Sequence, residues 1–511
     1  MSDAMTGGQA AIGVAFEAGI EVCFANAGTT EIHLVEALDR QPGIRSVLGL
    51  NEGICSGAAD GYSRIAGKPA LGLFHLGPGF ANSAANQHNA RRAFSPVVNL
   101  IGDQASWHMA ADASLTSDID AIAGWAGWVG RSTSADSVAA VVGEAIVQST
   151  TGTRGVASAV LHADHQWESV TAPLPKVSFG GPSDFDAAAV PVGAEALRRP
   201  GAALIAMGPM ISRASKAAMV AIREATGCAI WISRHASAEY GDGLVIPELP
   251  YFPEDLIAAA ADISTAVLAG GSEPVCFFGY PGQRSNVLAG ECEKVQLCHT
   301  EHDLDAVLQA LVAEVGAVPP EPGAVPPVER PTGELTSATL GQALIACLPD
   351  DAIVTQEAIT NRASMTPHMA GASRFTQLNL AGGAIGEGLP MAIGAAIAAP
   401  DRRVVAFQAD GSSLYSIQSL WTMAREELDI TIVLIDNRAY RIIEVEGMRA
   451  GLDPGTASRD LLELDRPHID YALVAQGFGV PAAQATTADE LVRLLDQANA
   501  TPGPFFIQAV L

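Results

Sequence analysis

Residues 403–437, RVVAFQADGSSLYSIQSLWTMAREELDITIVLIDN, decide the fold. The runs Arg403 to Gln408 and Ile430 to Ile435 are apolar and β-branched, which is typical of buried strands, and the apolar residues between them recur with helical spacing. Asp410 follows the first strand and Asn437 follows the second. Parallel strands end at one edge of a sheet, where helix starts offer N–H groups to anions. The pattern therefore predicts a parallel α/β sheet with two oxygen ligands beside a phosphate site.

The spacing of these two polar residues adds a more specific prediction. Asp410 and Asn437 are 27 positions apart, and the segment resembles the thiamine diphosphate (ThDP) signature, which runs from Gly-Asp-Gly to Asn-Asn. The resemblance implies that the two side chains and the backbone carbonyl of Ala439 bind Mg²⁺, which prefers oxygen ligands. The chain departs from the signature at Ala409 and Asp436. Taken alone, Asp-Gly is ordinary turn chemistry, so the motif needs support from elsewhere.

Support comes from Val47 to Asp103, which contains NEGICSGAADGYSRIAGKPALGLFHLGPG. This stretch resembles the pyrimidine-binding domain of the acetolactate synthase and benzoylformate decarboxylase group of ThDP enzymes. The resemblance places Glu52 against the aminopyrimidine of the cofactor. A carboxyl there favours the imino tautomer, whose nitrogen removes the C2 proton of the thiazolium. Without this context, Glu52 would be read as a solvated surface acid.

A third match is Ala381 to Gly394, AGGAIGEGLPMAIG. The resemblance gives Ile385 the position of the apolar residue that holds the cofactor bent, and Gly383 and Gly386 allow the backbone to approach a ligand closely. Glu387 departs from the family, which has an aromatic or apolar residue there. We expect Glu387 either to lie beside the cofactor, where its charge needs a partner or titrates abnormally, or to point to solvent.

The resemblance assigns a full set of site residues. Asn26 to Glu31, NAGTTE, resembles a turn that faces the substrate, which places Thr29 near the reacting carbonyl, and His75 matches a histidine that shuttles protons. A histidine at a strand end is also commonly structural, and this is the alternative interpretation of His75. The catalytic residues are Glu52, His75 and Thr29; the cofactor-binding residues are Glu52, Gly383, Ile385, Gly386, Asp410, Gly411, Ser412 and Asn437; the metal ligands are Asp410, Asn437 and Ala439. Tyr440, Ile442 and Ile443 are expected to line an apolar pocket.

Length and linkers predict the domain organisation. A chain of 511 residues is long enough for about three domains. The proline-rich stretch from 316 to 333 reads as a linker, and a looser break lies at 171–191. We therefore expect an α/β protein with three doubly wound parallel-sheet domains: pyrimidine-binding (1–172), central (190–316) and diphosphate-binding (334–511). In the central domain, Ala203 to Ala206 and Ala229 to Ile232 are predicted strands with a helix between them.

Composition narrows the class of protein. The net charge of −27 argues against binding to nucleic acid or anionic membranes. The apolar residues fall in strand-length runs, and no run is long enough to predict a membrane span. Seven cysteines without CxxC spacing favour reduced core thiols in a cytoplasmic protein. The amino terminus has no basic start and carries acidic residues, so neither a secretory nor a transit peptide is expected.

The function implied by the resemblance is a ThDP- and Mg²⁺-dependent reaction of a 2-oxo acid or related acyl donor. Ligation to a second carbonyl, as in acetolactate synthase, is the first hypothesis, and decarboxylation to an aldehyde, as in benzoylformate decarboxylase, is the alternative. A non-catalytic regulatory protein of the same fold is a third reading, motivated by Ala409, Asp436 and Glu387. An NAD-linked dehydrogenase is a weak one, because no G-x-G-x-x-G motif is found. For the same reason no FAD is predicted. The resemblance also implies a homodimer or homotetramer with active sites between subunits.

Overall fold

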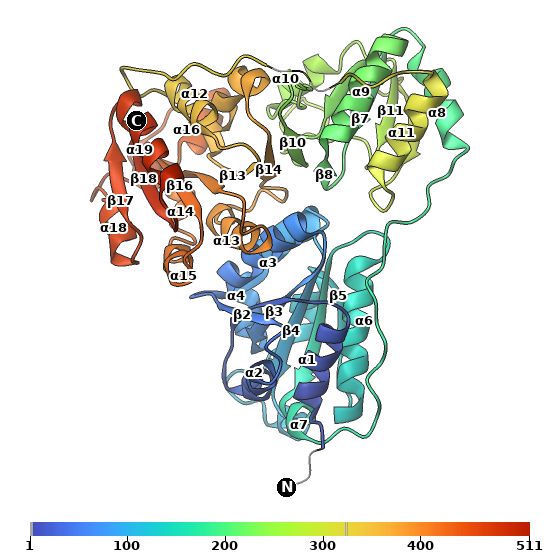
Figure 1. Ribbon diagram of the computed structural model, residues 1–511, viewed down its shortest axis with the longest axis vertical. Helices are drawn as coiled ribbons and strands as arrows, with labels where there is room; N and C mark the ends of the chain where they lie inside the picture. Colours follow the sequence, from blue (N-terminus) through green and yellow to red (C-terminus); the bar gives the residue numbers. More distant parts are fainter. Residues whose placement is uncertain (1–3, 322, 324) are drawn as a thin grey trace.

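Three sheets form the framework of the molecule, which a computed structural model describes for residues 4–321, 323 and 325–511. In Figure 1 the N-terminal sheet lies at the bottom, the central sheet at the upper right and the C-terminal sheet at the upper left. Parallel pairing dominates all three, which confirms the predicted fold class. Residues 1–3 of the amino terminus and residues 322 and 324 of the predicted linker lie outside the described residues.

The N-terminal sheet is entirely parallel, in the order β2-β1-β3-β4-β6-β5. Helices α1, α2 and α6 share one apolar core with the sheet, and α3, α4 and α5 share another, so both faces are covered. The strands are β1 Val22–Asn26, β2 Arg45–Leu48, β3 Ala70–His75, β4 Val97–Asp103, β5 Gly127–Arg131 and β6 Val156–His162; the helices are α1 Gly7–Glu17, η1 Thr29–Glu31, α2 Ile32–Asp39, α3 Glu52–Ala66, α4 Leu76–Arg92, η2 Ser106–Ala111, α5 Ile119–Gly124, η3 Ala135–Ser137, α6 Val138–Thr150 and α7 Ala163–Trp167.

The central sheet has four parallel strands in the order β12-β11-β7-β9. The two strands predicted here, and the helix between them, are confirmed. The strands are β7 Ala202–Ala206, β9 Ala229–Ile232, β11 Thr265–Ala269 and β12 Glu293–Cys298; the helices are α8 Ala189–Leu197, α9 Arg213–Thr226, α10 Pro253–Ala259 and α11 Leu304–Val315.

The C-terminal sheet has eight strands, in the order β17-β18-β16-β15-β13-β14-β10-β8. Six come from the C-terminal part of the chain: β13 Ala352–Glu357, β14 Phe375–Asn379, β15 Val404–Ala409, β16 Ile430–Asp436, β17 Ala482–Ala485 and β18 Phe505–Val510. The helices are α12 Ser337–Cys347, η4 Ile359–Gly371, α13 Gly388–Ala398, α14 Asp410–Ser413, α15 Ser419–Arg425, α16 Arg441–Arg449, α17 Thr456–Leu462, α18 Tyr471–Gly477 and α19 Ala488–Ala500. The helical spacing noted between the two strands therefore corresponds to the short helix α15, and a separate turn, α14, begins at Asp410.

The remaining two strands of this sheet, β8 Met210–Ile211 and β10 Ser237–Tyr240, come from the central part of the chain. β10 pairs antiparallel with β14, where the Tyr240 ring stacks on Phe375 with 5.0 Å between centroids. Sequence pattern did not predict this shared sheet, because a short edge strand has too few residues for a clear alternation. The central and C-terminal lobes are thereby joined through hydrogen bonds as well as through the linker.

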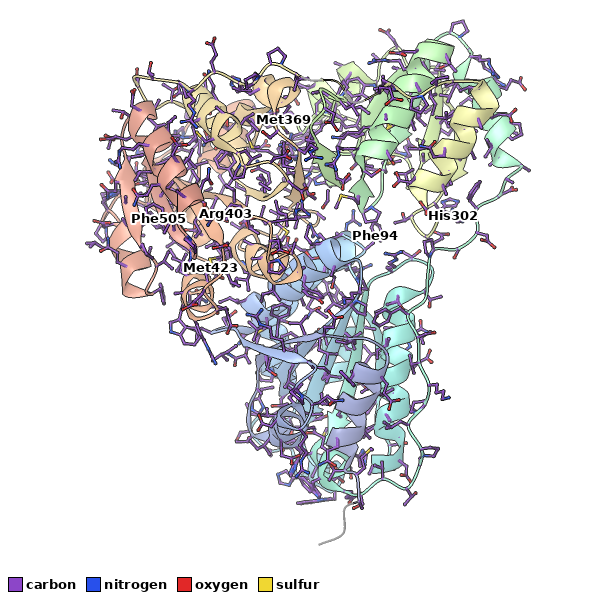
Figure 2. All side chains as sticks on the ribbon, in the orientation of Figure 1. Phe94, His302, Met369, Arg403, Met423 and Phe505 are labelled. Atoms are coloured by element: carbon purple, nitrogen blue, oxygen red, sulfur yellow. The ribbon has the colours of Figure 1, made fainter. Side chains whose placement is uncertain are left out.

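Helices α3 and α13 join the N-terminal and C-terminal lobes, and Figure 1 shows them side by side at the junction. A Cβ at Gly394 would lie 1.9 Å from the Ala58 carbonyl oxygen, and a Cβ at Gly61 would lie 2.1 Å from the Met391 oxygen. Glycine is required at both positions because the two backbones touch. The apolar core continues from this contact to Met423 of α15, which Figure 2 labels. None of the helices in the described ranges is long and apolar enough to cross a membrane.

Candidate active site

The carboxyl ends of β15 and β16 bring Asp410 and Asn437 together, as the sequence predicted. The two strands are parallel neighbours, with Ala409 beside Ile435. Asp410 is buried, and its Oδ2 accepts hydrogen bonds from the backbone N–H groups of Asn437 (2.9 Å) and Arg438 (2.5 Å). The carboxylate of Asp410 therefore fixes the loop after β16 against the loop after β15.

The predicted Mg²⁺ ligands fit a hard cation. Ala439 is buried two residues after Asn437, and its N–H donates to Asn437 Oδ1 at 3.1 Å. Burial, together with a smaller effect of the neighbouring Asp436 carboxylate, raises the pKa of Asp410 to about 6 against the lowering effect of backbone N–H groups. A bound divalent cation would offset both effects, because it favours the ionised carboxylate. The oxygen donors at this sheet edge are those that Mg²⁺ takes.

Asp436 lies between β18 and the loop after β16, where Arg438 Nε is 4.0 Å from its Oδ1. Its Oδ2 accepts a hydrogen bond from Gln508 Nε2 at 2.8 Å, and its Oδ1, although buried, has no hydrogen-bond partner among the described residues. His468 Nε2 lies 3.8 Å from Oδ2. Asp436 therefore contributes negative charge near Asp410 without replacing a predicted ligand.

The turn around Ile385 lies between β14 and α13. Gly383 and Gly386 have φ angles of 77° and 97°, in the left-handed region that favours glycine. A cavity of about 340 Å³ is lined by Gly383 and Ile385 from this turn, and by Ile442 and Ile443 from α16. Ile442 and Ile443, which were predicted for the pocket wall, therefore line the same cavity as these predicted cofactor residues. Tyr440, predicted with them, is not among the described lining residues, and its ring lies beside Gly411 instead.

Glu357 supports this turn, and it was not predicted from the sequence. It ends β13, is buried, and its Oε1 accepts the Gly386 N–H at 2.6 Å while Oε2 accepts the Gly388 N–H. Burial raises the pKa of Glu357 to about 7, although the two backbone N–H groups act in the opposite direction. The available signal was an acidic residue at the end of the apolar run AIVTQE, which is an unusual place for a charge.

The raised pKa of Glu357 predicts a pH-dependent stability. With a folded pKa near 7 and an ordinary value of 4.5, the folded state keeps a proton that the unfolded chain loses, so stability falls as pH rises between these values. We expect the free energy of unfolding of the wild type to fall by about 3 kcal/mol across this window. Glu357→Gln should abolish this fall, because glutamine does not titrate. Thermal unfolding of the cofactor-free protein at pH 5 and pH 8 measures it. Glu224→Gln, at an exposed position in α9, is the control, and parallel pH curves for wild type and Glu357→Gln would contradict the prediction.

Glu387 does not point to solvent, and it is not among the described residues that line the cavity. It is buried between α3 and α13, with Arg64 Nη2 at 3.9 Å and no described hydrogen-bond partner for either carboxylate oxygen. Burial raises its pKa well above the ordinary value, and the adjacent Asp60 carboxylate adds to this. Arg64 is already paired with Asp60, so it is shared between the two carboxyl groups. Glu387 is thus a buried acid at the contact between α3 and α13, and burial favours its protonated form.

The predicted site residues fall into two groups, which we call half-sites: Glu52 and His75 in the N-terminal lobe, and Asp410, Asn437 and Ala439 in the C-terminal lobe. Glu52 is the first residue of α3. Its side chain is half-buried, and Oε2 accepts a hydrogen bond from Asn82 Nδ2 at 3.1 Å. A Cβ at Gly79 would lie 3.2 Å from Glu52 Oε1, so the glycine keeps the carboxyl group uncrowded. Among the described residues no cation pairs with Glu52, which leaves the carboxyl group available to a ligand.

His75 is the last residue of β3, and its ring is held by a residue that the sequence did not single out. His75 Nδ1 lies 2.8 Å from Oε2 of the fully buried Glu31 and 3.1 Å from Thr30 Oγ1. The predicted Thr29 is exposed, and its side chain makes no hydrogen bond within the described part of the chain. The turn thus places Thr30 against His75, while Thr29 faces outward. Carboxylate contact at Nδ1 fixes the ring and leaves Nε2 for proton transfer.

The two half-sites are separate within one chain. In the described ranges, no hydrogen bond or ion pair joins Glu52 or His75 to Asp410, Asn437 or Ala439. Helix α3 carries Glu52 at its first turn, whereas its later turns pack on α13. One chain therefore carries both halves without bringing their side chains into contact.

The family follows from comparison with known proteins. The C-terminal TPP binding domain model of thiamine pyrophosphate enzymes matches residues 362–509, and the N-terminal TPP binding domain model matches residues 5–123. Over 99% of both chains, the sequence is 43% identical to the "Putative acetolactate synthase large subunit IlvX" of Mycobacterium tuberculosis. The protein belongs to the thiamine pyrophosphate enzyme family, whose cofactor is the ThDP predicted above.

Two further relatives agree with this family. Benzoylformate decarboxylase of Pseudomonas aeruginosa is 26% identical over 96% of both chains. The solved structure of a thiamine diphosphate-dependent 4-hydroxybenzoylformate decarboxylase from Rhodococcus jostii has a TM-score of 0.83, covers 99% of this chain and 98% of its own, and is 22% identical. The protein is thus a ThDP-dependent enzyme of the transferase or lyase type, related to acetolactate synthase and to benzoylformate decarboxylase.

Proposed function

We propose that the protein makes or breaks a carbon–carbon bond next to the carbonyl of a 2-oxo acid, with Mg²⁺ and ThDP held at the ends of β15 and β16. Ligation to a second carbonyl, as the name of the M. tuberculosis relative indicates, is the main hypothesis. The observation that carries the proposal is the pair of half-sites. In one lobe Asp410 holds the loop after β16 against the loop after β15, and in another the Glu52 carboxyl group has no cation beside it among the described residues.

Each residue has a defined task in this proposal. Asp410, Asn437 and the Ala439 carbonyl hold Mg²⁺, and Gly411 and Ser412, at the start of α14, lie where N–H groups meet a diphosphate. Ile385 supports the cofactor from the glycine turn, and Glu357 holds that turn. Bound ThDP supplies a carbon nucleophile and an electron sink. Glu52 holds a proton at the pyrimidine ring, and this position controls the formation of that nucleophile.

Decarboxylation with release of an aldehyde is the second candidate, and the His75–Glu31 pair favours it. A histidine oriented by a buried carboxylate can deliver a proton to the product carbon. The apolar wall of Ile385, Ile442 and Ile443 favours loss of CO₂, because a carboxylate is poorly solvated there. The same wall serves ligation when a second carbonyl compound enters before the proton is delivered.

The test is a product assay. The purified protein is incubated with ThDP, Mg²⁺ and either pyruvate or benzoylformate, and CO₂ and products are followed by NMR. A hydroxy-ketone or acetohydroxy acid supports the ligase, and free aldehyde supports the decarboxylase. No ThDP-dependent turnover of these or longer 2-oxo acids would contradict the proposal.

The proposal includes a homodimer or homotetramer in which Glu52 of one subunit completes the cofactor site of another. The separation of the half-sites within one chain supports this arrangement. It also places the enzyme in the cytoplasm, since all seven cysteines are buried and unpaired, as in a reducing compartment. An active monomer, measured by light scattering at micromolar concentration, would contradict the assembly.

The proposed enzyme uses no FAD, and this remains a prediction. A second cavity of about 560 Å³ lies beside the carboxyl ends of β7 and β11, where open α/β sheets bind ligands, and it is lined by Met207, Gly208, Gly270 and Gly271. A flavin absorption spectrum of the purified protein would overturn the prediction.

A further inference from the structure

Arg234, which has no ion-pair partner among the described residues, lines the cavity that contains the Ile385 turn. Most of the cavity wall is apolar, from Tyr251, Phe277, Phe278, Ile385, Ile442 and Ile443. Arg234 follows β9, and its backbone carbonyl accepts a hydrogen bond from Asn379 Nδ2 at 3.3 Å. This contact ties the arginine to the end of β14, just before the cofactor turn.

The charges around Arg234 are not balanced locally. Arg362 also lines the cavity, and its Nη2 pairs with Glu248 Oε2 at 2.7 Å, while Tyr240 donates to the other oxygen of Glu248 at 2.9 Å. Glu248 is thus fully used, and no carboxylate in the described ranges lies within 4.0 Å of the Arg234 guanidinium. Burial and the charge of Arg362 lower the pKa of Arg234 to about 10, against the opposing effect of the Glu248 charge, so Arg234 is charged at pH 7.

The other ionisable groups of the wall do not neutralise Arg234. Burial lowers the pKa of His235 to about 4, so this ring is neutral at pH 7. Glu446 uses its Oε2 both to accept a hydrogen bond from Tyr280 at 2.8 Å and to pair with Arg449 at 2.6 Å, and its buried Oε1 has no hydrogen-bond partner among the described residues. Neither oxygen forms an ion pair with Arg234. The Arg234 cation, which lies 5.4 Å from the Tyr251 ring centroid, therefore lacks a counterion among the described residues that line this cavity. A charge held in an apolar cavity without a partner is costly unless a ligand supplies one.

We propose that Arg234 binds a carboxylate of the substrate that is remote from the reacting carbonyl, so that the preferred acyl donor is a 2-oxo dicarboxylic acid. This inference rests on the proposed function, which places the reaction beside Ile385. The carboxylate that leaves as CO₂ loses its charge in the transition state, and an ion pair to it would stabilise the ground state instead. A retained carboxylate keeps its pair throughout the reaction, so Arg234 matches the far end of the molecule. The aromatic and isoleucine side chains would contact the carbon chain between the two ends.

The experiment compares two acids of equal carbon number in the full-length protein loaded with ThDP and Mg²⁺. Wild type is expected to have a kcat/KM at least about tenfold higher for 2-oxoglutarate than for 2-oxopentanoate. Arg234→Gln should lower the ratio of these two kcat/KM values about 10- to 100-fold, and Arg234→Lys should recover part of it. Arg493→Gln, at an exposed position in α19, is the control and keeps the wild-type ratio. An unchanged ratio in Arg234→Gln, or no preference in wild type, would overturn the inference.

A binding measurement separates this inference from the proposed function. Glutarate has two carboxylates and no reacting carbonyl, so calorimetric titration of the loaded protein detects the Arg234 contact even without turnover. Wild type should bind glutarate at least about tenfold more tightly than pentanoate, and Arg234→Gln should lose this preference. Failure of wild type to bind glutarate, or equal binding by the variant, would overturn the role of Arg234, whereas absence of any 2-oxo acid turnover with glutarate binding intact would overturn the proposed reaction alone.

Discussion

Glu52→Gln is expected to reduce ThDP-dependent turnover about a thousandfold, within the range that general acid–base groups contribute. The half-buried carboxyl group has one hydrogen bond, to Asn82 Nδ2 at 3.1 Å, and no described cation beside it. Glutamine keeps the size and the hydrogen bond but cannot hold the proton that the pyrimidine ring requires. The fold should therefore be unchanged, and the loss should fall on kcat.

Cofactor binding in this variant distinguishes a catalytic effect from a structural one. The Mg²⁺ and diphosphate ligands lie at Asp410 and Asn437, in a different lobe, so titration with ThDP should give a Kd within about tenfold of wild type. Glu17→Gln, at an exposed position in α1, is the matched control and should keep full turnover. Turnover of Glu52→Gln near the wild-type rate would remove Glu52 from the mechanism. If wild type and Glu52→Gln were equally inactive toward every acyl donor, the non-catalytic alternative would be favoured instead.

The sequence was informative where a residue's role follows from its position along one strand. The two buried strands of the C-terminal sheet have strongly apolar runs, so the location of Asp410 and Asn437 at their ends could be read directly. The glycine turn around Ile385 was equally readable, since its positive φ angles require glycine. Each of these elements can therefore be predicted from its own segment of the sequence.

Other parts of the site depend on contacts between distant segments. Glu31 and His75 are 44 residues apart and meet only because β1 and β3 are neighbours in the sheet. The sequence did not single out Thr30, which contacts His75, because a one-residue difference in a turn decides which side chain faces the ring. Glu387 shows the same limit: its neighbours Asp60 and Arg64 come from α3, so its burial could not be read from the AGGAIGEG segment. A pattern identifies an element, whereas the partner of a side chain depends on how elements pack.

Mixing two inactive variants should restore about a quarter of wild-type activity, if each site contains Glu52 from one subunit and Asp410 from another. Glu52→Gln lacks the proton-holding carboxyl group, and Asp410→Asn lacks a metal ligand and the acceptor that holds Asn437 and Arg438. In a hybrid of the two, one site receives both intact residues and the other receives neither. Random exchange makes half of the dimers hybrid, each with half of its sites intact.

The measurement uses subunits with two different tags, co-refolded or co-expressed, so that hybrids can be purified by both tags and should show about half of wild-type activity. A mixture of Glu52→Gln with the double variant Glu52→Gln/Asp410→Asn is the control, because no subunit then supplies Glu52. The separation of the two half-sites in one chain makes recovery the expected result. Hybrids as inactive as their parents would mean that each chain completes its own site, and helices α3 and α13 would then have to move apart or rotate to bring Glu52 to Asp410.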